Sequence, residues 1–561
     1  MSTPNEPKQQ SRRKFLKYTA GAVAVAVVGG VSYYYYGQST APMTSMTTSA
    51  ASVTSATSAA SVATSAAIKN PKYGGILKYA ISGEPPGLDP QKSSLTVVAV
   101  TASNVYEALL DMDPDGKLIP QLAETWEMPD PLIHIYHLRD NVYFHNGRKM
   151  VADDVKYSFE RVMDPATGCP YQSDTTTWDK VEALDDKTLR ITLKQPQPAL
   201  DAWLAGGGNG GLAFMVVNKE TVEKYGDLQQ NMIGTGPFKF VEFKKGDHIT
   251  FERFENYWRK DPDTGDQLPY LDGLVGTFQP DTEVNLANLL TEQTMWTNVV
   301  NPNDWAKVSV NPDLTALNPK SLRFRALHFN TRKKPWNDAR VRRAAAMGID
   351  REEINKVVYF GMGPSAANPF AHLPPPYNNL PIPDLPQYDP EGAKKLLADA
   401  GYPNGFDDVL MGCPSPDERK SAEVVAAQLT KIGIRCKVDE PELARLLDLF
   451  FVKFDYSFCV CGGGGNVDPE VNMVDYGPLP DLVAGYNNPD VIAMYKQQSQ
   501  EADPDKRAKI WGDILNQAWG KDVYAVWLTY VPVLYLYRKY VKGFQWGEDM
   551  RWRWTSVYLQ K

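Results

Sequence analysis

One stretch of the chain, residues 136–162, places a strand, a turn and a helix in immediate succession. A β-rich run leads into the Asn146-Gly147 pair, whose residue types favour a tight turn. Asp153 and Asp154 then suit the first turn of a helix. The apolar residues that follow recur at the i, i+4 and i+7 spacing of one helical face: Val155, Phe159 and Val162. The stretch therefore predicts mixed α/β architecture, and its residues are expected to act as scaffold.

Other stretches repeat this mixture of strands and helices. Partial period-two alternation of apolar residues predicts strands at residues 76–81, 189–193 and 238–243. A helix is predicted between Asp389, which suits the N-cap position, and Gly401, which suits the left-handed residue after a helix. We find no repeat at the periods typical of solenoids or propellers. The expected fold class is α/β.

Size and composition narrow the class of protein further. The 493 residues after Ile68 exceed what one hydrophobic core usually holds, so we expect two lobes. A composition of 43% hydrophobic and 22% charged residues is ordinary for a folded domain, and the net charge of −8 argues against nucleic acid as a partner. Only Cys459 and Cys461 of the five cysteines are close in sequence, so no disulfide framework is expected.

The first 37 residues read as an export signal. Arg12 and Arg13 lie in a twin-arginine pattern, and residues 18–36 follow without a charge. At about 1.5 Å per residue these 19 residues could cross a bilayer core of roughly 30 Å, which would make the segment a membrane anchor. Its many small residues, and Ala41 shortly after it, equally suit a cleaved signal peptide. Both alternatives stay open.

Residues 38–70 have the composition of a disordered stalk. Between Gln38 and Ile68, 24 of 31 residues are Ser, Thr or Ala, and none is charged, so this segment cannot bury a core. Placed directly after a candidate anchor, such a stalk would hold a domain away from the membrane surface. The alternative is an unstructured remnant without a role.

Motifs along nearly the whole chain after the stalk occur in a recognisable order. Besides residues 136–162 they lie at residues 83–90, 104–109, 234–238, 268–273, 335–344 and 388–405. In sequence and order they resemble the extracellular solute-binding proteins of ABC transporters, specifically the peptide, oligopeptide and nickel type known as family 5. A resemblance that extends over so much of the chain is far more specific than one motif.

The resemblance implies a two-lobed periplasmic-binding-protein-like fold with a hinge and a large discontinuous first lobe. Lobe I is then expected at residues 71–328, lobe II at 329–517, and a return segment at 518–561 that completes lobe I. The protein would capture an oligopeptide between the lobes and present it to the permease subunits of an importer. This implies no enzymatic activity, no cofactor, no metal, and a monomer.

One departure from the family pattern bears on the ligand. Peptide-binding relatives place an Asp four residues before the acidic-Pro pair of the cleft loop, where it binds the ammonium group of a peptide; this chain has Gly465 there, before Asp468 and Pro469. Asp468 or Glu84 could substitute for that carboxylate. Late aromatic residues suit stacking on sugar rings or apolar side chains, so an oligosaccharide ligand remains an alternative.

A secreted hydrolase is the alternative from another class of protein. The six histidines include no HExxH motif, and the chain contains neither a GxSxG nucleophile elbow nor a GxxxxGK[ST] phosphate loop. His134 and His137 lie an odd number of residues apart on a predicted strand, so they should point to opposite faces and make poor partners for one metal. The binding-protein interpretation is therefore preferred.

The candidate ligand-binding residues follow from the geometry that the resemblance implies, in which loops at strand ends face the cleft. For each of them a structural role as turn former, cap or core aromatic is an equal alternative. The candidates from lobe I, the crossover, the lobe II cleft loop and the return segment are Glu84, Asn104, Tyr106, Asn330, Gly463, Gly465, Asn466, Asp468, Trp527 and Tyr530.

Overall fold

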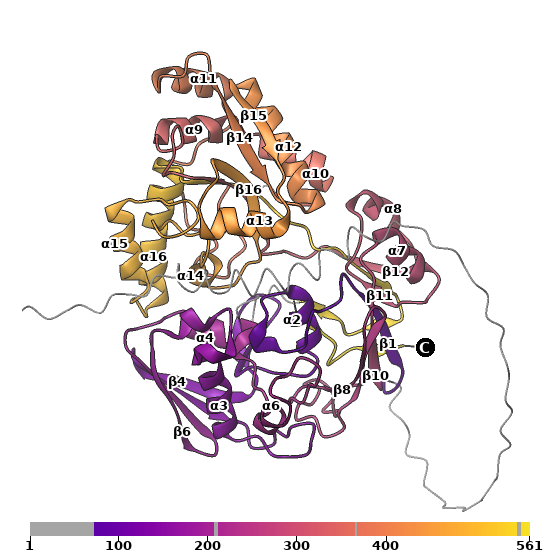
Figure 1. Ribbon diagram of the computed structural model, residues 1–561. Coiled ribbons are helices and arrows are strands. Elements are labelled where there is room, and N and C mark those ends of the chain that lie inside the picture. The colour runs from indigo at the N-terminus through magenta and orange to yellow at the C-terminus, as the bar shows by residue number, and fades with distance from the viewer. Residues whose placement is uncertain (1–71, 207–210, 365–366, 547–550, 561) are drawn as a thin grey trace, which may run out of the picture.

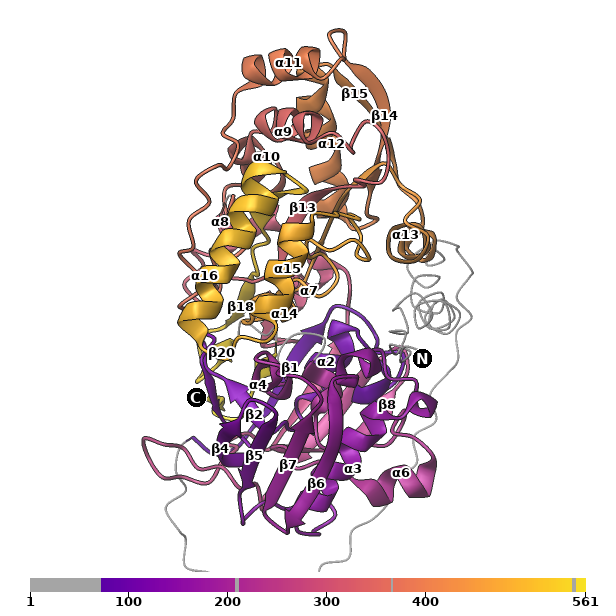
Figure 2. The same ribbon diagram turned by 90° about the vertical axis from the view of Figure 1, so that its left-hand side faces the viewer.

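The computed structural model describes residues 72–206, 211–364, 367–546 and 551–560. Two α/β lobes lie one above the other, the lower one built mainly from the first half of the chain and the upper one mainly from the second (Figures 1 and 2). The predicted export signal at residues 1–37, with Arg12 and Arg13, and the predicted stalk at 38–70 lie outside the described residues. Within the described part of the chain, no helix is both long and apolar enough to span a bilayer.

Lobe I contains a seven-stranded mixed sheet and a four-stranded antiparallel sheet. In spatial order the large sheet is β12 (Leu314–Leu317), β18 (Tyr535–Arg538), β11 (Trp296–Thr297), β1 (Ile76–Ile81), β10 (Gly273–Phe278), β9 (His248–Arg253) and β8 (Phe238–Lys244). The small sheet is β4 (Ala123–Asp130), β5 (Ile133–Leu138), β7 (Thr188–Leu193) and β6 (Trp178–Asp185). These bounds confirm the strands predicted near residues 76–81, 189–193 and 238–243.

Helices and short ribbons complete lobe I. The helices are α2 (Thr96–Ala102), α3 (Ala152–Met163), α4 (Leu200–Leu204), α6 (Lys219–Tyr225), α7 (Thr282–Leu290) and α8 (Trp305–Val308). The two-stranded ribbons pair β2 (Leu110–Met112) with β3 (Leu118–Pro120), β19 (Val541–Lys542) with β22 (Tyr558–Leu559), and β20 (Gln545–Trp546) with β21 (Trp552–Arg553).

Lobe II is built around a five-stranded sheet. Its order is β15 (Ile434–Asp439), β14 (Phe406–Gly412), β16 (Phe458–Gly463), β13 (Phe324–Phe329) and β17 (Ala525–Tyr530). Its helices are α9 (Ala339–Met347), α10 (Arg351–Tyr359), α11 (Pro390–Asp399), α12 (Pro416–Lys431), α13 (Leu443–Leu447), α14 (Pro469–Asn472), α15 (Pro489–Gln498) and α16 (Pro504–Leu515). Asp389 caps α11 by accepting a hydrogen bond from the Gly392 amide at 2.8 Å, which confirms the predicted start of that helix.

Sheet membership corrects the expected lobe boundaries. The predicted boundary at 328/329 divides β13 between the lobes, and the predicted return segment from residue 518 puts β17 in lobe I. In the structure, the two strands pair with each other in the sheet of lobe II. The chain therefore crosses between lobes at residues 318–323 and 531–534, after β12 and before β18. Lobe I comprises the described residues of 72–317 and 535–560, and lobe II those of 324–530.

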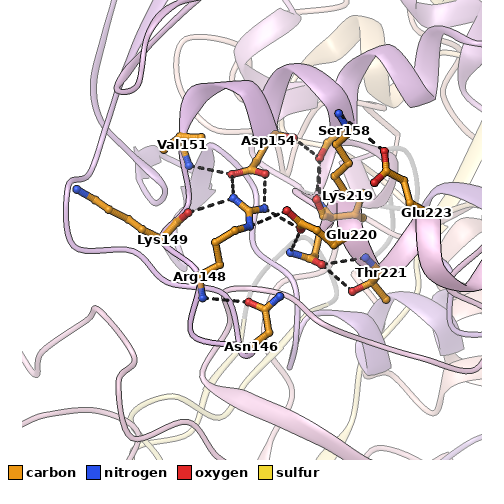
Figure 3. A network of polar contacts seen from close by, with 12 residues as sticks. Asn146, Arg148, Lys149, Val151, Asp154, Ser158, Lys219, Glu220, Thr221 and Glu223 are labelled. Carbon is orange, nitrogen blue, oxygen red and sulfur yellow. Dashed lines mark hydrogen bonds and ion pairs between the residues drawn. The ribbon is translucent and has the colours of Figure 1, made fainter.

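The strand, turn and helix at residues 136–162 form as predicted and act as scaffold. Val155, Phe159 and Val162 of α3 are fully buried. Arg148, after the turn, donates two hydrogen bonds to Asp154 at 2.9 and 2.5 Å and one to Glu220 at 3.0 Å, so it ties the start of α3 to α6 (Figure 3). This network fixes the packing of two helices within lobe I.

The two lobes are packed against each other. One continuous cluster of buried apolar side chains contains Trp203 and Phe214 of lobe I together with Met473 and Trp511 of lobe II. Tyr171 packs on the same cluster from lobe I, and its pKa is raised by burial and by the negative charge of Asp475 in lobe II. The structure is therefore a closed arrangement of the lobes.

Candidate ligand-binding site

A cavity of about 50 Å³ lies where the chain crosses between the lobes. Both crossing segments contribute to it, through Arg323 and Val533, and the rest of its wall comes from lobe I. We call it the interlobe cavity, and its full lining is Ser82, Thr96, Val97, Val100, Asn298, Arg323, Val533, Tyr535 and Trp552. A ligand held here would contact the segments about which the lobes move relative to each other.

The interlobe cavity is small compared with known ligand sites. A water molecule takes about 30 Å³ in the liquid, whereas pockets for small-molecule ligands span about 300–1,000 Å³. A volume of about 50 Å³ therefore holds little more than one water while the lobes are packed together. A larger ligand needs the lobes to separate and then to close around it.

Arg323 supplies the positive charge of the interlobe cavity. Its backbone is fixed, since its carbonyl accepts a hydrogen bond from the Val531 amide at 2.8 Å and its own amide donates to Ser321 Oγ at 3.0 Å. The guanidinium group makes no hydrogen bond or ion pair with any residue that the structure describes. Burial lowers the pKa of Arg323 and the nearby positive charge of Arg325 lowers it further, whereas the negative charges of Asp417 and Glu418 partly offset these two effects. An anionic ligand group would offset both effects.

Aromatic side chains also line the cavity. Trp552 and Tyr535 line it, and both pack on Trp296, with ring centroids 4.6 and 5.5 Å away. Because Trp296 is fully buried, this wall is rigid. A cavity lined by a guanidinium and by aromatic rings can hold a carboxylate next to an apolar group.

A larger cavity of about 350 Å³ lies elsewhere on lobe I. Its lining includes Tyr73 and Gly74, which precede β1, whereas Ser82 of the interlobe cavity follows that strand. Arg253 in its wall is already paired with Asp272 at 2.7 Å. This cavity is at the other end of β1 from the crossings, so lobe movement would not enclose it.

The three candidates from lobe I do not line the interlobe cavity. Glu84 is exposed and its Oε2 accepts a hydrogen bond from the Gly246 amide at 2.7 Å. The Asn104 amide group donates to two carbonyls of α2, at 3.2 and 3.1 Å, and so caps that helix. Tyr106 is 1% exposed and belongs to the apolar core. Asn104 and Tyr106 therefore have the structural roles, as cap and as core aromatic, that the sequence left open as alternatives.

Three further candidates stabilise lobe II internally. Asn330 donates to the carbonyls of Phe454 and Tyr456, both at 2.9 Å. The Trp527 ring is fully buried and stacks on Phe324 at 4.5 Å between centroids. Tyr530 donates to the Pro369 carbonyl at 2.9 Å and stacks on His372 at 3.8 Å. These contacts leave each side chain committed to the core of lobe II.

Gly465 packs against the first crossing segment. A Cβ atom at this position would lie 2.3 Å from Leu322 Cβ and 2.5 Å from the Leu322 carbonyl oxygen. Gly463 is similarly covered by the ring of Tyr476, which a Cβ would meet at 3.0 Å. A carboxylate side chain at residue 465 therefore has no room in this arrangement.

Asp468 cannot replace that carboxylate while its present bonds remain. Its Oδ1 accepts hydrogen bonds from Arg507 Nη2 at 3.0 Å and, as the N-cap of α14, from the Glu470 amide at 2.8 Å. Arg507 is 2% exposed, so this is a buried ion pair. Asn466 accepts a hydrogen bond from the Asp468 amide at 3.1 Å and shapes the same loop.

Arg323 is not among the binding residues predicted from the sequence. The resemblance places the crossover at 328/329 and therefore points to residues near Asn330. The sequence does contain a signal for Arg323, because it is a cation directly before the apolar run of β13. Such a residue lies where the chain leaves one sheet for the other.

Comparison with known proteins identifies the family. The profile of the bacterial extracellular solute-binding proteins, family 5 Middle, matches residues 117–477. The chain is 31% identical to heme-binding protein A of Haemophilus influenzae over 73% of this chain and 79% of that protein. It is 30% identical to the dipeptide-binding protein of Escherichia coli over 64% of this chain and 71% of that protein.

A solved structure agrees with these relatives. The periplasmic binding protein DppA of Helicobacter pylori, in complex with the peptide STSA, superposes with a TM-score of 0.73 and 26% identity, covering 88% of this chain and 99% of that one. The expected two-lobed α/β fold is thereby confirmed. By its sequence match and its fold, the chain belongs to family 5 of the bacterial extracellular solute-binding proteins.

Proposed function

We propose that this protein is the extracytoplasmic solute-binding component of an ABC importer and that it captures an oligopeptide between its lobes. The family consists of binding proteins, and a dipeptide-binding relative and a peptide-bound structural neighbour are both similar over most of the chain. The observation that carries the proposal is the interlobe cavity, which joins both crossing segments to lobe I and holds the unpaired Arg323 guanidinium. Covalent chemistry has no part in this proposal.

Arg323 is proposed to bind the carboxylate end of the peptide. A guanidinium can donate two parallel hydrogen bonds to one carboxylate, and a charge-assisted bond of this kind is stronger than a neutral one. The ammonium end must be met by a group other than residue 465. The rings of Trp552 and Tyr535 would pack on an apolar side chain of the peptide.

Closure follows from population shift. A ligand that contacts Arg323 and Val533 of the crossings as well as Ser82 and Asn298 of lobe I makes its full set of contacts only when the lobes are together. It therefore stabilises the closed state by its additional contacts there. Permease subunits that recognise the closed form are the proposed partners of a monomeric binding protein.

An oligosaccharide is the second candidate ligand, and one observation favours it. Trp552 and Tyr535 present aromatic surface to the interlobe cavity, as sites that stack on sugar rings do. A neutral sugar would leave the Arg323 guanidinium without a direct ion pair, and for this reason the peptide is preferred.

The proposal also includes the first 70 residues. Their twin-arginine pattern, uncharged run and Ser/Thr/Ala-rich stretch support export followed by tethering to the outer face of the cytoplasmic membrane. Cleavage of the signal would instead release the binding protein. Immunoblotting of membrane and soluble fractions with an antibody against lobe I separates the two outcomes.

Native mass spectrometry of the full chain, purified without denaturation from cells grown in rich medium, tests the ligand class. A spread of peptide masses is expected, and a hexose ladder would transfer the assignment to oligosaccharide uptake. A synthetic copy of a trapped peptide is then titrated calorimetrically into the wild type and into the Arg323→Gln variant. The variant should bind about 10- to 100-fold more weakly, as for the loss of a hydrogen bond to a charged group.

A second peptide shows whether Arg323 acts on the carboxylate. Amidating the carboxyl end of the peptide should weaken its binding to the wild type. In Arg323→Gln, amidation should reduce the affinity only slightly, because the substitution has already removed the same bond. Arg435→Gln is the matched control, since Arg435 is exposed and pairs with Asp407 on lobe II at 2.7 Å. Equal losses on amidation in wild type and Arg323→Gln would contradict the proposed role.

A further inference from the structure

Three cysteines gather in lobe II behind the loop that holds Gly463 and Gly465. Cys459 and Cys461 are two apart on β16 and so share one face of the sheet. Strand β14 runs parallel to β16 with Met411 beside Cys459, and this register brings Cys413, just beyond β14, next to Cys461. All three side chains are buried. Cys413 is distant from the other two in sequence, so their spacing along the chain does not reveal this grouping.

Glu418 adds a carboxylate to the thiols. It lies in the first turn of α12. One of its carboxylate oxygens and the sulfur atoms of Cys413 and Cys461 all lie within 4.8 Å of one another. It accepts a hydrogen bond from Ser415, and its Oε1 is 3.5 Å from Arg325 Nε. Burial raises the pKa of Glu418 to about 7.

His328 provides a separate observation. It lies opposite Cys459 in the register of β13 and β16 and is fully buried. Neither ring nitrogen meets hydrogen-bond geometry with a described residue, although the backbone of Cys461 lies near the ring. A buried imidazole whose ring nitrogens make no well-formed hydrogen bond with a described residue, next to two thiols, is unusual for a purely apolar core.

The thiols already interact with one another. The side chains of Cys413, Cys459 and Cys461 lie within hydrogen-bonding reach of one another and belong to one buried cluster.

We infer that Cys413, Cys461 and Glu418 bind a single thiophilic divalent cation such as Zn²⁺, with Cys459 as the fourth ligand. Thiolates select Zn²⁺ and similar soft cations over Mg²⁺ or Ca²⁺. Sulfur atoms around tetrahedral zinc lie about 3.8 Å apart, given Zn–S bonds of about 2.3 Å, so ligand atoms within 4.8 Å need only small movements. Binding displaces the thiol protons to solvent, and Arg325 offsets the remaining negative charge.

This site is separate from the interlobe cavity and does not depend on the proposed ligand. A closed set of four protein ligands is the pattern of a structural metal, which here would join β14, β16 and α12. Tyr476, whose hydroxyl donates to the Gly462 carbonyl at 2.9 Å, lies between the cluster and the loop that follows β16. The cation would therefore stiffen the base of that loop.

Cadmium titration of the full chain tests the site, after reduction and removal of metals with a chelator. Thiolate-to-Cd²⁺ charge transfer should appear in the ultraviolet and saturate at one equivalent. Cys413→Ser and Cys461→Ser should each weaken binding by at least about tenfold. Cys169→Ser and Cys436→Ser are matched controls and should titrate like the wild type, because Cys169 is in lobe I and Cys436 packs in another cluster of lobe II. Elemental analysis of protein purified without chelator should find zinc.

Glu418→Gln keeps the test decisive if a serine variant fails to fold, since it preserves side-chain shape and should also weaken Cd²⁺ binding. Circular dichroism identifies the variants that are folded. The inference is overturned if the reduced wild type shows no charge-transfer band, or if the cluster variants bind Cd²⁺ as tightly as the controls. Peptide mapping that finds a disulfide among Cys413, Cys459 and Cys461 in protein purified without reductant would also overturn it.

Discussion

Two residues decide how a charged ligand can be held. Arg323 offers an unpaired cation at the crossing of the lobes, whereas Gly465 sits against Leu322 with no space for a side chain. The proposed binding site consequently has a fixed positive charge and no carboxylate at residue 465. A ligand with an anionic end matches this distribution better than one recognised through its ammonium group.

A part-buried histidine makes stability depend on pH. A ring nitrogen of His145 lies 2.9 Å from the Gly236 carbonyl oxygen, and burial lowers the pKa of His145 from 6.5 to about 4. Between these values the unfolded chain binds the proton and the folded protein does not. The free energy of unfolding should therefore fall as the pH is lowered from 6.5 to 4, by at most about 1.4 kcal/mol per pH unit from this group.

Urea unfolding at several pH values checks this prediction. His145→Asn should show a smaller loss of stability between pH 6.5 and pH 4 than the wild type. His137→Asn is the control, because the His137 side chain is 45% exposed. Parallel pH profiles for wild type and His145→Asn would contradict the assignment.

At the scale of elements, helix α14 is held to α16 by the Asp468–Arg507 pair. Asp468→Asn removes the charge but keeps the shape, so the guanidinium of Arg507, which is 2% exposed, retains only Glu470 at 3.2 Å as a charged partner. The expected loss in the free energy of unfolding is about 1–3 kcal/mol, measured by urea denaturation at neutral pH.

The ligand affinity of the Asp468→Asn variant distinguishes a structural role from a binding role. We expect unchanged affinity for the trapped peptide at a temperature where the variant is fully folded. Asp407→Asn serves as control, because that side chain is 80% exposed in its ion pair and its loss should cost at most about 1 kcal/mol. A large fall in affinity with unchanged stability would return Asp468 to the ligand site.

Elements were predictable from the sequence where local chemistry determines them. The N-cap at Asp389 and the apolar face of α3 need only neighbouring residues, and both predictions are confirmed. The lobe boundaries and the ligand residues were not predictable in the same way. Whether β17 pairs in lobe I or lobe II, and whether Trp527 faces a cleft or a core, depends on contacts between residues far apart in sequence.

At the scale of the whole molecule, contacts between the lobes set how long a ligand stays bound. Tyr171 of lobe I packs on the shared apolar cluster near Asp475 of lobe II. Tyr171→Ala should weaken closure, so the trapped peptide should dissociate faster while the stability of each lobe changes little. Stopped-flow fluorescence measures the rate.

X-ray scattering of the same variant should show a larger radius of gyration than the wild type in the absence of ligand. Tyr225→Ala is the matched control, since Tyr225 lies 47% exposed on lobe I. An unchanged dissociation rate with unchanged scattering would mean that Tyr171 is not a closing contact.

The order of strands in lobe I has a consequence for how the protein is made. Strand β18 lies between β12 and β11 in the seven-stranded sheet, yet the whole of lobe II separates it from β12 along the chain. During synthesis from the amino end, every strand of lobe II is complete before β18 leaves the ribosome. Lobe II can therefore fold first, whereas lobe I has a gap in its central sheet until the last residues arrive.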